Sequence, residues 1–303
     1  MTLLDALLLR AGYNAALVAL GAALLGAAAG VAGTFLFLRG RALVSDAVAH
    51  ATLPGVGLAF LLMVALGGDG RWLPGLLVGS AATALLGLAI VEWLVRRTRL
   101  AEDAAIGAVL SVFFGIGVVL LTIIQGLGAG RAAGLEGFLL GSAAGMLRSE
   151  ALLIAVAGLL ITVLTLAARR SMTLVAFDPG FATATGVNVA LIDRLTMGIV
   201  AAVTVIGLKI VGLILIVALL IVPSVAARFW TDRIGVLLGL AALFGAVAGY
   251  VGAALSASAP ALPTGPIIVM VLAAIFVASL LAAPNRGAVA TAWRRARAGR
   301  GAA

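Results

Sequence analysis

Residues Leu43 to Leu62 read LVSDAVAHATLPGVGLAFLL, an apolar stretch that carries a carboxylate and an imidazole. Its length matches the roughly 20 residues that a helix needs to span a bilayer. Asp46 and His50 interrupt the apolar character, and His50 is the only histidine among 303 residues. Because ionisable side chains are disfavoured inside a membrane, those that are retained there usually mark a pathway or a site.

The spacing of Asp46 and His50 indicates what kind of site to expect. Residues four apart lie on one face of a helix, so the two side chains point the same way. A carboxylate and an imidazole together suit a divalent transition metal ion. The plainer alternative is a hydrogen-bonded pair that only helps the helices to pack.

One chain offers too few ligands for a closed metal site. A tetrahedral zinc site needs four ligands, and the chain has no cysteine and no second histidine. A two-fold dimer with this helix at its axis would bring two copies of Asp46 and two of His50 together. Loose coordination would also serve, since a transported ion must be released.

The composition predicts an all-α polytopic membrane protein with one transmembrane domain over residues 1–303. The chain is 64% hydrophobic, and its mean hydropathy is +1.28. Its net charge of +9 does not indicate nucleic-acid binding, because the arginines occupy short loops and the C-terminal tail. Three pairs of glycines have the small-xxx-small spacing that lets membrane helices approach closely, namely Gly26 and Gly30, Gly235 and Gly239, and Gly245 and Gly249.

Apolar runs predict about nine transmembrane segments, with eight as the alternative. They lie near 14–38, 43–66, 73–95, 104–125, 150–168, 190–208, 210–227, 234–255 and 265–283. The run from Leu195 to Val225 is too long for one span, so we expect a break near Gly207, Lys209 and Gly212. The segment 134–147 is too short to span and is predicted to be interfacial or re-entrant.

The arginines predict the orientation of the chain in the membrane. With the loops 39–42, 96–103, 169–190 and 228–233 in the cytoplasm, the 20 basic residues divide fifteen to five in favour of that side. This orientation leaves the N-terminus outside and the C-terminus inside. Residues 286–303 are expected to form a basic cytoplasmic tail close to anionic lipid.

Two prolines and one loop have features that bear on function. Pro54, followed by Gly55, removes the hydrogen bond to the carbonyl of His50, and Pro223 does the same for the carbonyl of Leu219. Such kinks suit a helix that lines a translocation path, although proline kinks are also common in ordinary spans. In the loop 169–190, Asp178 and Gly186 are placed to begin and end a short helix that could dock a soluble partner.

Missing motifs exclude several enzyme classes. The only lysine, Lys209, follows a leucine, so no G-x-x-x-x-G-K-[ST] phosphate loop exists. A single histidine rules out an H-E-x-x-H zinc protease, and no G-x-S-x-G nucleophile motif is present. We therefore expect no enzyme activity, no catalytic residues and no resident cofactor.

Four segments resemble the zinc- and manganese-type ABC transporter permeases. The first is FLRGRALVSDAVAHATLPGVGLAF, whose family pattern appears here as Asp46, Ala49-His50 and Leu53-Pro54-Gly55. Members usually have serine where this chain has Ala49. The others are FDPGFATATGV (177–187), KIVGLILIVALLIVPSVAARFWTDR (209–233) and LPTGPIIVM (262–270). In the segment FDPGFATATGV, the family often has an acidic residue in place of Gly180.

This resemblance implies the membrane subunit of an ATP-driven metal importer that works as a homodimer in the bacterial inner membrane. Two cytoplasmic ABC ATPase subunits would bind ATP and dock on the loop 169–190. A periplasmic or lipid-anchored binding protein would deliver zinc or manganese, and Asp46 and His50 match the family's metal-path positions. The coupling-loop positions are Phe177, Asp178, Pro179, Gly180, Ala182 and Gly186.

Other classes remain possible from the residues alone. A proton-coupled secondary metal transporter would use Asp46 and His50 as a proton relay, but the inverted repeats common in that class are not evident. A membrane enzyme with His50 as a base lacks a nucleophile motif, and a structural anchor has no need of an ionisable pair within a span. Raw affinity favours zinc over manganese but does not decide which ion is transported, so zinc is preferred only narrowly.

Overall fold

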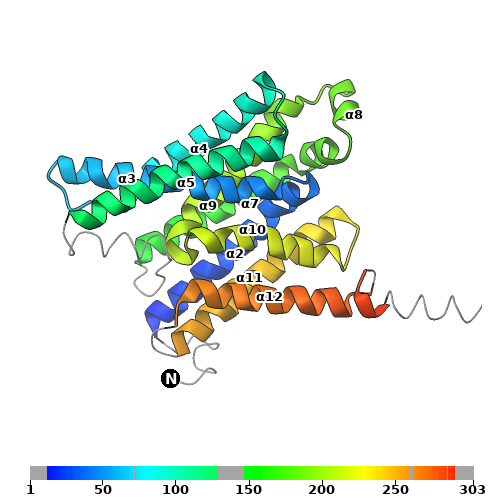
Figure 1. The fold of residues 1–303 in the computed structure, drawn as a ribbon. Helices are drawn as coiled ribbons and strands as arrows, with labels where there is room; N and C mark the ends of the chain where they lie inside the picture. Colours follow the sequence, from blue (N-terminus) through cyan, green and yellow to red (C-terminus); the bar gives the residue numbers. More distant parts are fainter. Residues whose placement is uncertain (1–11, 71, 128–146, 259–261, 285, 291–303) are drawn as a thin grey trace, which may run out of the picture. The chain divides into compact units, whose positions relative to one another are not determined.

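The computed structural model describes residues 12–290 except 71, 128–146, 259–261 and 285 (Figure 1). Within these residues the regular structure is helical and no strand occurs, which confirms the all-α prediction. The helices are α2 (Tyr13–Leu38), α3 (Ala42–Ala65), α4 (Leu73–Arg97), α5 (Glu102–Gly126), α7 (Arg148–Phe177), α8 (Pro179–Ala184), α9 (Val189–Val211), α10 (Leu213–Arg228), α11 (Ile234–Ser258) and α12 (Thr264–Ala282).

Eight helices of the described part are long and apolar enough to cross a membrane. The predicted span 210–227 corresponds to α10, which has only 16 residues. At 1.5 Å per residue, α10 is about 24 Å long, shorter than a hydrocarbon core of about 30 Å. By length alone the count therefore matches the eight-span alternative, with α10 as an additional short helix; the predicted orientation, which has the termini on opposite sides, requires α10 to cross as well. The predicted interfacial segment 134–147 falls almost wholly outside the described residues, as does most of the tail 286–303.

The break between α9 and α10 occurs at one residue. Gly212 has φ +81°, in the region that favours glycine, and it separates Val211 from Leu213. The prediction placed the break over Gly207, Lys209 and Gly212, but the helix continues through the first two. A glycine inside a helix lowers its stability by only about 1 kcal/mol, so Gly207 alone does not end α9.

The loop predicted at 169–190 is shorter in the structure. Helix α7 continues to Phe177 instead of ending near 168, and at 30 residues it is about 45 Å long. Arg169 and Arg170 are exposed on this helical extension. The prediction took the two arginines as the end of the helix, but arginine is a good helix former and marks only where the helix leaves the apolar layer.

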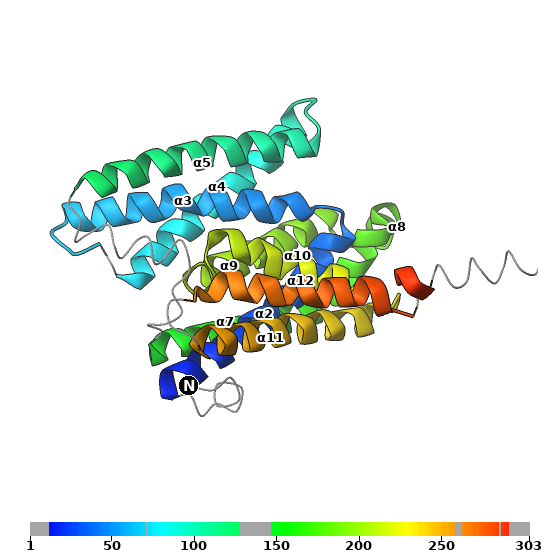
Figure 2. The ribbon, with the colours of Figure 1, turned by 60° about the horizontal axis from the view of Figure 1, so that its bottom comes forward.

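The chain divides into two compact units. Unit 1 contains residues 1–38, 144–165 and 218–303, and unit 2 contains residues 39–143 and 166–217. In unit 1, α11 packs against α2 and α12, and Figures 1 and 2 both show α11 running beside α12.

Close backbone contact joins α2 to α11 in unit 1. A Cβ added to Gly26 would collide with the carbonyl of Gly245, and one added to Gly249 would collide with the carbonyl of Ala22. These contacts confirm that the small-xxx-small glycines of α2 and α11 let the two helices approach closely. Gly235 and Gly239, in contrast, have no neighbouring heavy atom within 4 Å of such a Cβ.

Unit 2 is built around α3, which contacts α4, α5 and α9. Figure 2 shows α3 and α5 side by side along most of their length. The carbonyl of Gly79 on α4 lies against Gly55, and Leu53 on α3 lies against Gly117 of α5. Small residues thus bring both neighbours tightly against the helix that carries Asp46 and His50.

We expect Gly245→Ala to lower the stability of the protein by about 1–3 kcal/mol, because the new methyl group meets backbone atoms that cannot rotate away. The thermal unfolding midpoint of the purified protein in detergent measures the effect. Gly239→Ala, on the same helix but facing open space, is the matched control and should leave the midpoint unchanged or slightly raised. Equal midpoints for the two variants would contradict the close α2–α11 contact.

Candidate functional site

Asp46 and His50 form a direct pair on α3, as their spacing predicted. The His50 Nδ1 atom lies 3.2 Å from Oδ1 of the Asp46 carboxylate and 3.0 Å from the Asp46 backbone oxygen. The His50 side chain is only 18% exposed. The sequence prediction that both groups share one face of the helix is therefore correct.

The pairing determines which nitrogen of His50 is available. The hydrogen-bond partner of Nδ1 is the Asp46 backbone oxygen, which is an acceptor, so in the neutral imidazole Nδ1 carries the proton and donates it. The other nitrogen, Nε2, then keeps its lone pair for a ligand. A carbonyl or carboxylate oxygen that accepts from one ring nitrogen is the arrangement found behind many metal-binding histidines. In this chain Asp46 orients His50 through its backbone oxygen, and its carboxylate lies on the same Nδ1 side of the ring.

The surroundings of the pair limit the movement of the imidazole. The ring of Phe114 on α5 makes an edge contact with His50, with the ring centres 5.2 Å apart. Pro54 lies one turn further along α3 and is buried, and the helix continues through it to Ala65. Sequence reasoning missed Phe114, since an aromatic residue in an apolar span gives no signal of its own.

A single chain does not complete a metal site within the described residues. No group of three or more His, Cys, Asp or Glu side chains that could hold an ion occurs there. The pair thus offers the nitrogen of His50 and an oxygen of Asp46, which agrees with the shortage of ligands noted in the sequence. The dimer-axis hypothesis remains a prediction.

The predicted short helix of the cytoplasmic loop is present as α8. The Asp178 carboxylate accepts a hydrogen bond from the Phe181 N–H at 2.8 Å, and Pro179 begins the helix. Gly186, with φ +83°, follows its C-terminal end. These features confirm the predicted start and end of the helix, although its role stays a prediction.

Two aromatic side chains around α8 are exposed to solvent, whereas a small side chain of α8 itself is buried. Phe177 and Phe181 are 60% and 55% exposed, whereas Ala182 is fully buried. Gly180 lies near the capping carboxylate of Asp178. The exposed rings of Phe177, at the end of α7, and Phe181, on α8, form an apolar surface of the kind that protein partners cover.

Pro223 belongs to unit 1, on α10. Beside it, the hydroxyl of Ser224 donates to the Gly30 carbonyl at 3.1 Å and lies 3.2 Å from the hydroxyl of Thr34. The proline is therefore found where α10 packs against α2 through buried polar groups. Gly55 belongs to unit 2, where it lets α4 approach α3.

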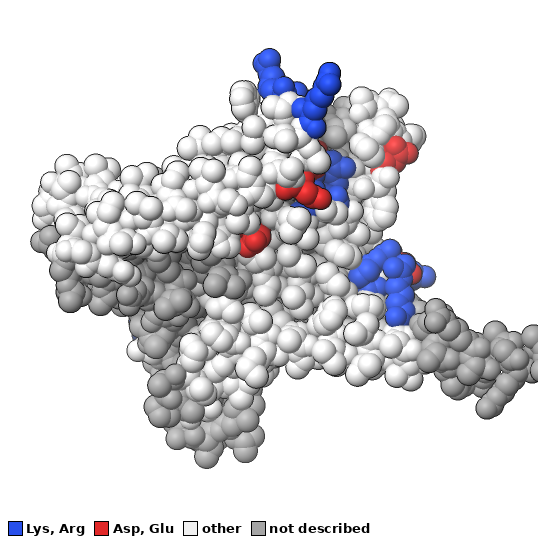
Figure 3. Space-filling model, viewed as in Figure 1, with Lys and Arg blue, Asp and Glu red and all other residues white. Residues whose placement is uncertain are grey.

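Sequence reasoning also missed a cluster of charges at one end of unit 2. Its members are Arg39, Arg41, Glu102 and Asp193, which come from the starts of α3, α5 and α9 and from the turn before α3. Figure 3 shows charged side chains gathered where α4 ends and α5 begins, while the length of α5 is uncharged. The sequence did offer one signal for this cluster. Acidic residues are rare in the chain, 11 in all, so an acidic residue near the end of a span is a candidate partner for a nearby arginine.

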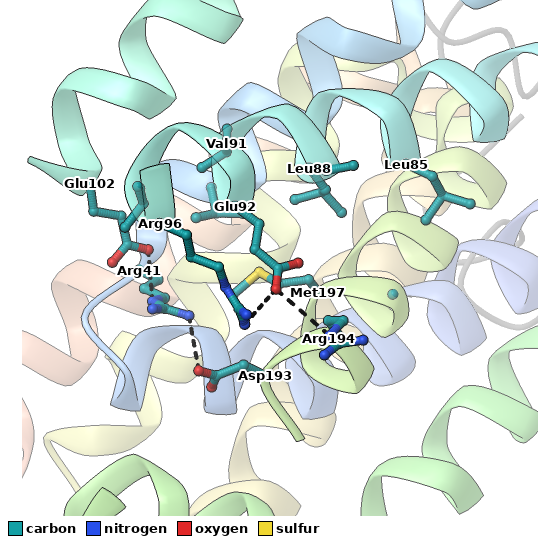
Figure 4. Close-up of a pocket in the computed structure, with 14 residues that line it drawn as sticks. Arg41, Leu85, Leu88, Val91, Glu92, Arg96, Glu102, Asp193, Arg194 and Met197 are labelled. Atoms are coloured by element: carbon teal, nitrogen blue, oxygen red, sulfur yellow. Dashed lines mark ion pairs between the residues drawn. The ribbon is translucent and has the colours of Figure 1, made fainter. Parts of the chain in front are cut away.

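A cavity of about 340 Å³ lies beside this cluster in unit 2 (Figure 4). Apolar side chains such as Leu85, Leu88 and Met197 line part of it, and Glu92 binds Arg96 at 2.6 Å on its rim. Neither Asp46 nor His50 lines the cavity, so it is distinct from the candidate metal site.

Comparison with known proteins agrees with the fold. The model of the ABC 3 transport family matches residues 13–283, which is most of the chain. The chain belongs to the ABC 3 transport family. Its membership confirms the resemblance to zinc- and manganese-type ABC permeases that four sequence segments indicated.

Two relatives and one solved structure are similar to this ABC 3 family chain over nearly its whole length. The manganese transport system membrane protein MntC of Bacillus subtilis is 40% identical over 281 residues, covering 93% of this chain but 63% of its own length. The zinc transport system membrane protein TroC of Treponema pallidum is 40% identical over 285 residues, with 94% of each chain covered. PsaBC from Streptococcus pneumoniae in complex with Fab matches with a TM-score of 0.79 at 28% identity, covering 94% of this chain and 96% of that one.

We expect zinc or manganese to raise the unfolding temperature of the purified protein, because an ion that binds only the folded state stabilises it. His50→Ala should abolish the shift. Asp46→Asn should weaken metal affinity by about 10- to 100-fold, the usual effect of losing a group that orients a histidine ligand. Metal titrations followed by thermal unfolding give both values.

The matched control for this titration is Asp232→Asn, which removes a carboxylate that pairs with Arg228 and Arg286 in unit 1. Its metal-induced shift should equal that of the wild type. A full shift in His50→Ala would show that the pair serves packing alone.

Proposed function

We propose that this chain is the membrane-spanning subunit of an ATP-driven importer of divalent metal ions, with zinc preferred and manganese next. The observation that carries the proposal is the Asp46–His50 pair on α3, which leaves Nε2 of a lone intramembrane histidine free for a ligand. Membership of the ABC 3 transport family supports it, as do relatives named for manganese and zinc transport.

The ion would be held by His50 Nε2, which points away from the Asp46 oxygens that contact Nδ1. A homodimer with α3 at its axis would bring two Asp46 and two His50 side chains together, so that the carboxylate of one copy could join the imidazole of the other around a four-coordinate ion. Pro54 cannot donate to the His50 carbonyl, which could add an oxygen to the path. Weak and shared coordination suits a pathway, since an ion that is held too tightly does not leave.

The energy would come from separate subunits. The chain has no phosphate loop, so ATP would be bound and hydrolysed by two cytoplasmic ABC ATPase subunits. The exposed rings of Phe177 and Phe181 around α8 form the surface that such a subunit would cover. A periplasmic or lipid-anchored protein would deliver the metal at the opposite face. Closure of the ATPases would then switch the spans between outward-open and inward-open states.

The charge contacts support the predicted orientation. In unit 2, ion pairs draw together Arg39, Arg41, Glu102 and Asp193, all from segments at predicted cytoplasmic loops. In unit 1, Asp232 pairs with Arg228 and Arg286, which joins the loop 228–233 to the start of the C-terminal tail. We place both groups on the cytoplasmic side of the bacterial inner membrane, with the N-terminus outside and the C-terminus inside.

Uptake of radiolabelled zinc and manganese tests this function directly. Proteoliposomes that contain the chain with its ATPase and binding protein should take up metal only with ATP. His50→Ala and Asp46→Ala should each lower uptake by about ten-fold or more, as expected for loss of a ligand or of the group that orients it. Asp232→Asn is the control and should transport normally.

The outcomes of the uptake assay separate the alternatives. Uptake driven by a proton gradient without ATP would replace the importer with a proton-coupled secondary transporter. Normal ATP-dependent uptake in both folded pair variants would assign Asp46 and His50 to packing. The ion taken up faster identifies the preferred metal.

A second experiment tests the docking surface. Phe181→Ala should weaken binding of the ATPase subunits by about ten-fold, because exposed aromatic anchors commonly dominate such interfaces. Pull-down or titration in detergent measures the affinity. Val78→Ala, which changes an exposed apolar side chain on α4, is the control and should bind normally. Unchanged affinity in Phe181→Ala would place the interface elsewhere.

A further inference from the structure

Arg39 joins two segments that flank α8. Its Nη2 group donates to both carboxylate oxygens of Asp193, at 2.8 and 2.7 Å, and its Nη1 group donates to the Val175 carbonyl at 2.9 Å. Val175 is in the last turn of α7, and Asp193 is in the first turns of α9. Since α8 lies between these two helices in the chain, one guanidinium group holds the segments on both sides of α8.

Arg41 extends the connection to α5. Its Nε atom lies 2.8 Å from a carboxylate oxygen of Glu102, and its Nη1 atom lies 3.5 Å from Asp193 (Figure 4). Asp193 is therefore shared by two arginines. The side chains of Arg39 and Asp193 are only 17% and 23% exposed, so solvent screens their pair less than an ordinary surface pair.

The same two arginines lie directly before the helix with the metal pair. Helix α3 begins at Ala42, and Asp46 follows Arg41 by five positions, a rise of about 7.5 Å along a helix. The helix is continuous from Ala42 past His50. A displacement of its N-terminal end is therefore passed to the pair with little loss.

The forked contact is suited to transmitting a force. The Nη2 group is shared by both oxygens of one carboxylate while Nη1 of the same planar guanidinium donates to the Val175 carbonyl, and these contacts from two nitrogens fix the direction of the group, which a single point-charge contact does not. A movement of α8 shifts the end of α7 or the start of α9, and Asp193 and Val175 then move Arg39. The turn between α2 and α3 then moves as well, because its residues Arg39 and Arg41 are bound to α5, α7 and α9.

We propose that Arg39, Arg41 and Asp193 are positioning residues that couple the movement of α8 to the metal pair on α3. This inference rests on the proposed function, because it assigns to these residues the transmission of the ATPase movement. None of the three touches the ion. Their loss should therefore separate ATP hydrolysis from transport without removing the ability to bind metal.

The test measures metal uptake and ATP hydrolysis in the same proteoliposomes, with the ATPase and binding protein present. Asp193→Asn keeps the shape of the side chain but removes the charge that holds both arginines. We expect hydrolysis to stay near the wild-type rate while the number of ions moved per ATP falls about ten-fold. Asp193→Glu, which restores a carboxylate, should recover part of the ratio.

Arg96→Gln is the matched control. It removes an arginine whose ion pair, with Glu92, lies within α4, and it leaves in place the 3.7 Å contact between Glu92 and Arg194 of α9. Its ratio of uptake to hydrolysis should equal that of the wild type. The metal-induced rise in unfolding temperature should be normal in Asp193→Asn and in Arg96→Gln, since neither residue contacts the ion.

Several outcomes would overturn the inference. An unchanged ratio in Asp193→Asn would do so, as would a parallel loss of uptake and hydrolysis in a folded protein. If Asp193→Asn does not fold, the same ratio is measured for Arg41→Gln, which removes the contacts of Arg41 with Glu102 and Asp193 but leaves the pair of Arg39 with Asp193 intact. Failure of both variants to fold would make the cluster a folding element alone. Absence of ATP-dependent uptake in the wild type would instead contradict the proposed function.

Discussion

Water does not reach the hydrocarbon core of a bilayer, so each polar group held there needs a partner from the protein. The hydroxyls of Thr34, Thr165 and Thr204 meet this need locally, each donating to the carbonyl four residues earlier at 2.7–2.8 Å. The Asp46–His50 pair follows the same rule. Its internal hydrogen bond, from Nδ1 to the Asp46 backbone oxygen, gives the imidazole a partner from the protein within the same helix.

Close packing supports this arrangement. Without a hydrophobic force between helices in lipid, small residues let backbones approach and gain contact. Gly55 and Gly79 bring α3 and α4 together, and Gly117 brings α5 against Leu53. As a result the segment with His50 lies on a rigid helix with Phe114 beside the ring, and a ligand placed on a rigid element keeps its direction.

The same need for partners in the bilayer explains where the charged side chains lie. Arginines and carboxylates are tolerated where the helices end. Some pair there within one helix, as Glu92 does with Arg96, and others pair across elements, as Arg39 does with Asp193. Arg39, Arg41, Glu102 and Asp193 connect the starts of α3, α5 and α9 in the unit that also holds α8 and the Asp46–His50 pair. The elements proposed to bind the ion, to receive the ATPase and to link the two thus belong to one compact unit.

Local features of the sequence predicted what depends on near neighbours. The apolar runs predicted the long helices, the i,i+4 spacing predicted the contact of Asp46 with His50, and Asp178 and Gly186 predicted α8. These predictions were correct because a helix, a cap and an i,i+4 pair are decided within a few residues. Where the end of a helix depended on more than local charge, as at Phe177 in α7, the prediction was wrong.

The sequence by itself determined the membrane class, the placement of the charges at the ends of the spans and the chemistry available to the lone histidine. Only the tertiary structure decided which acid meets which arginine, as in the pair of Arg39 and Asp193, 154 positions apart. It also decided which glycines are buried at contacts, since a Cβ added to Gly245 would collide with α2, whereas one added to Gly239 would meet no atom of the described residues within 4 Å. The physical reason is that hydrogen bonds along a helix follow from spacing, whereas contacts between helices depend on how whole surfaces fit.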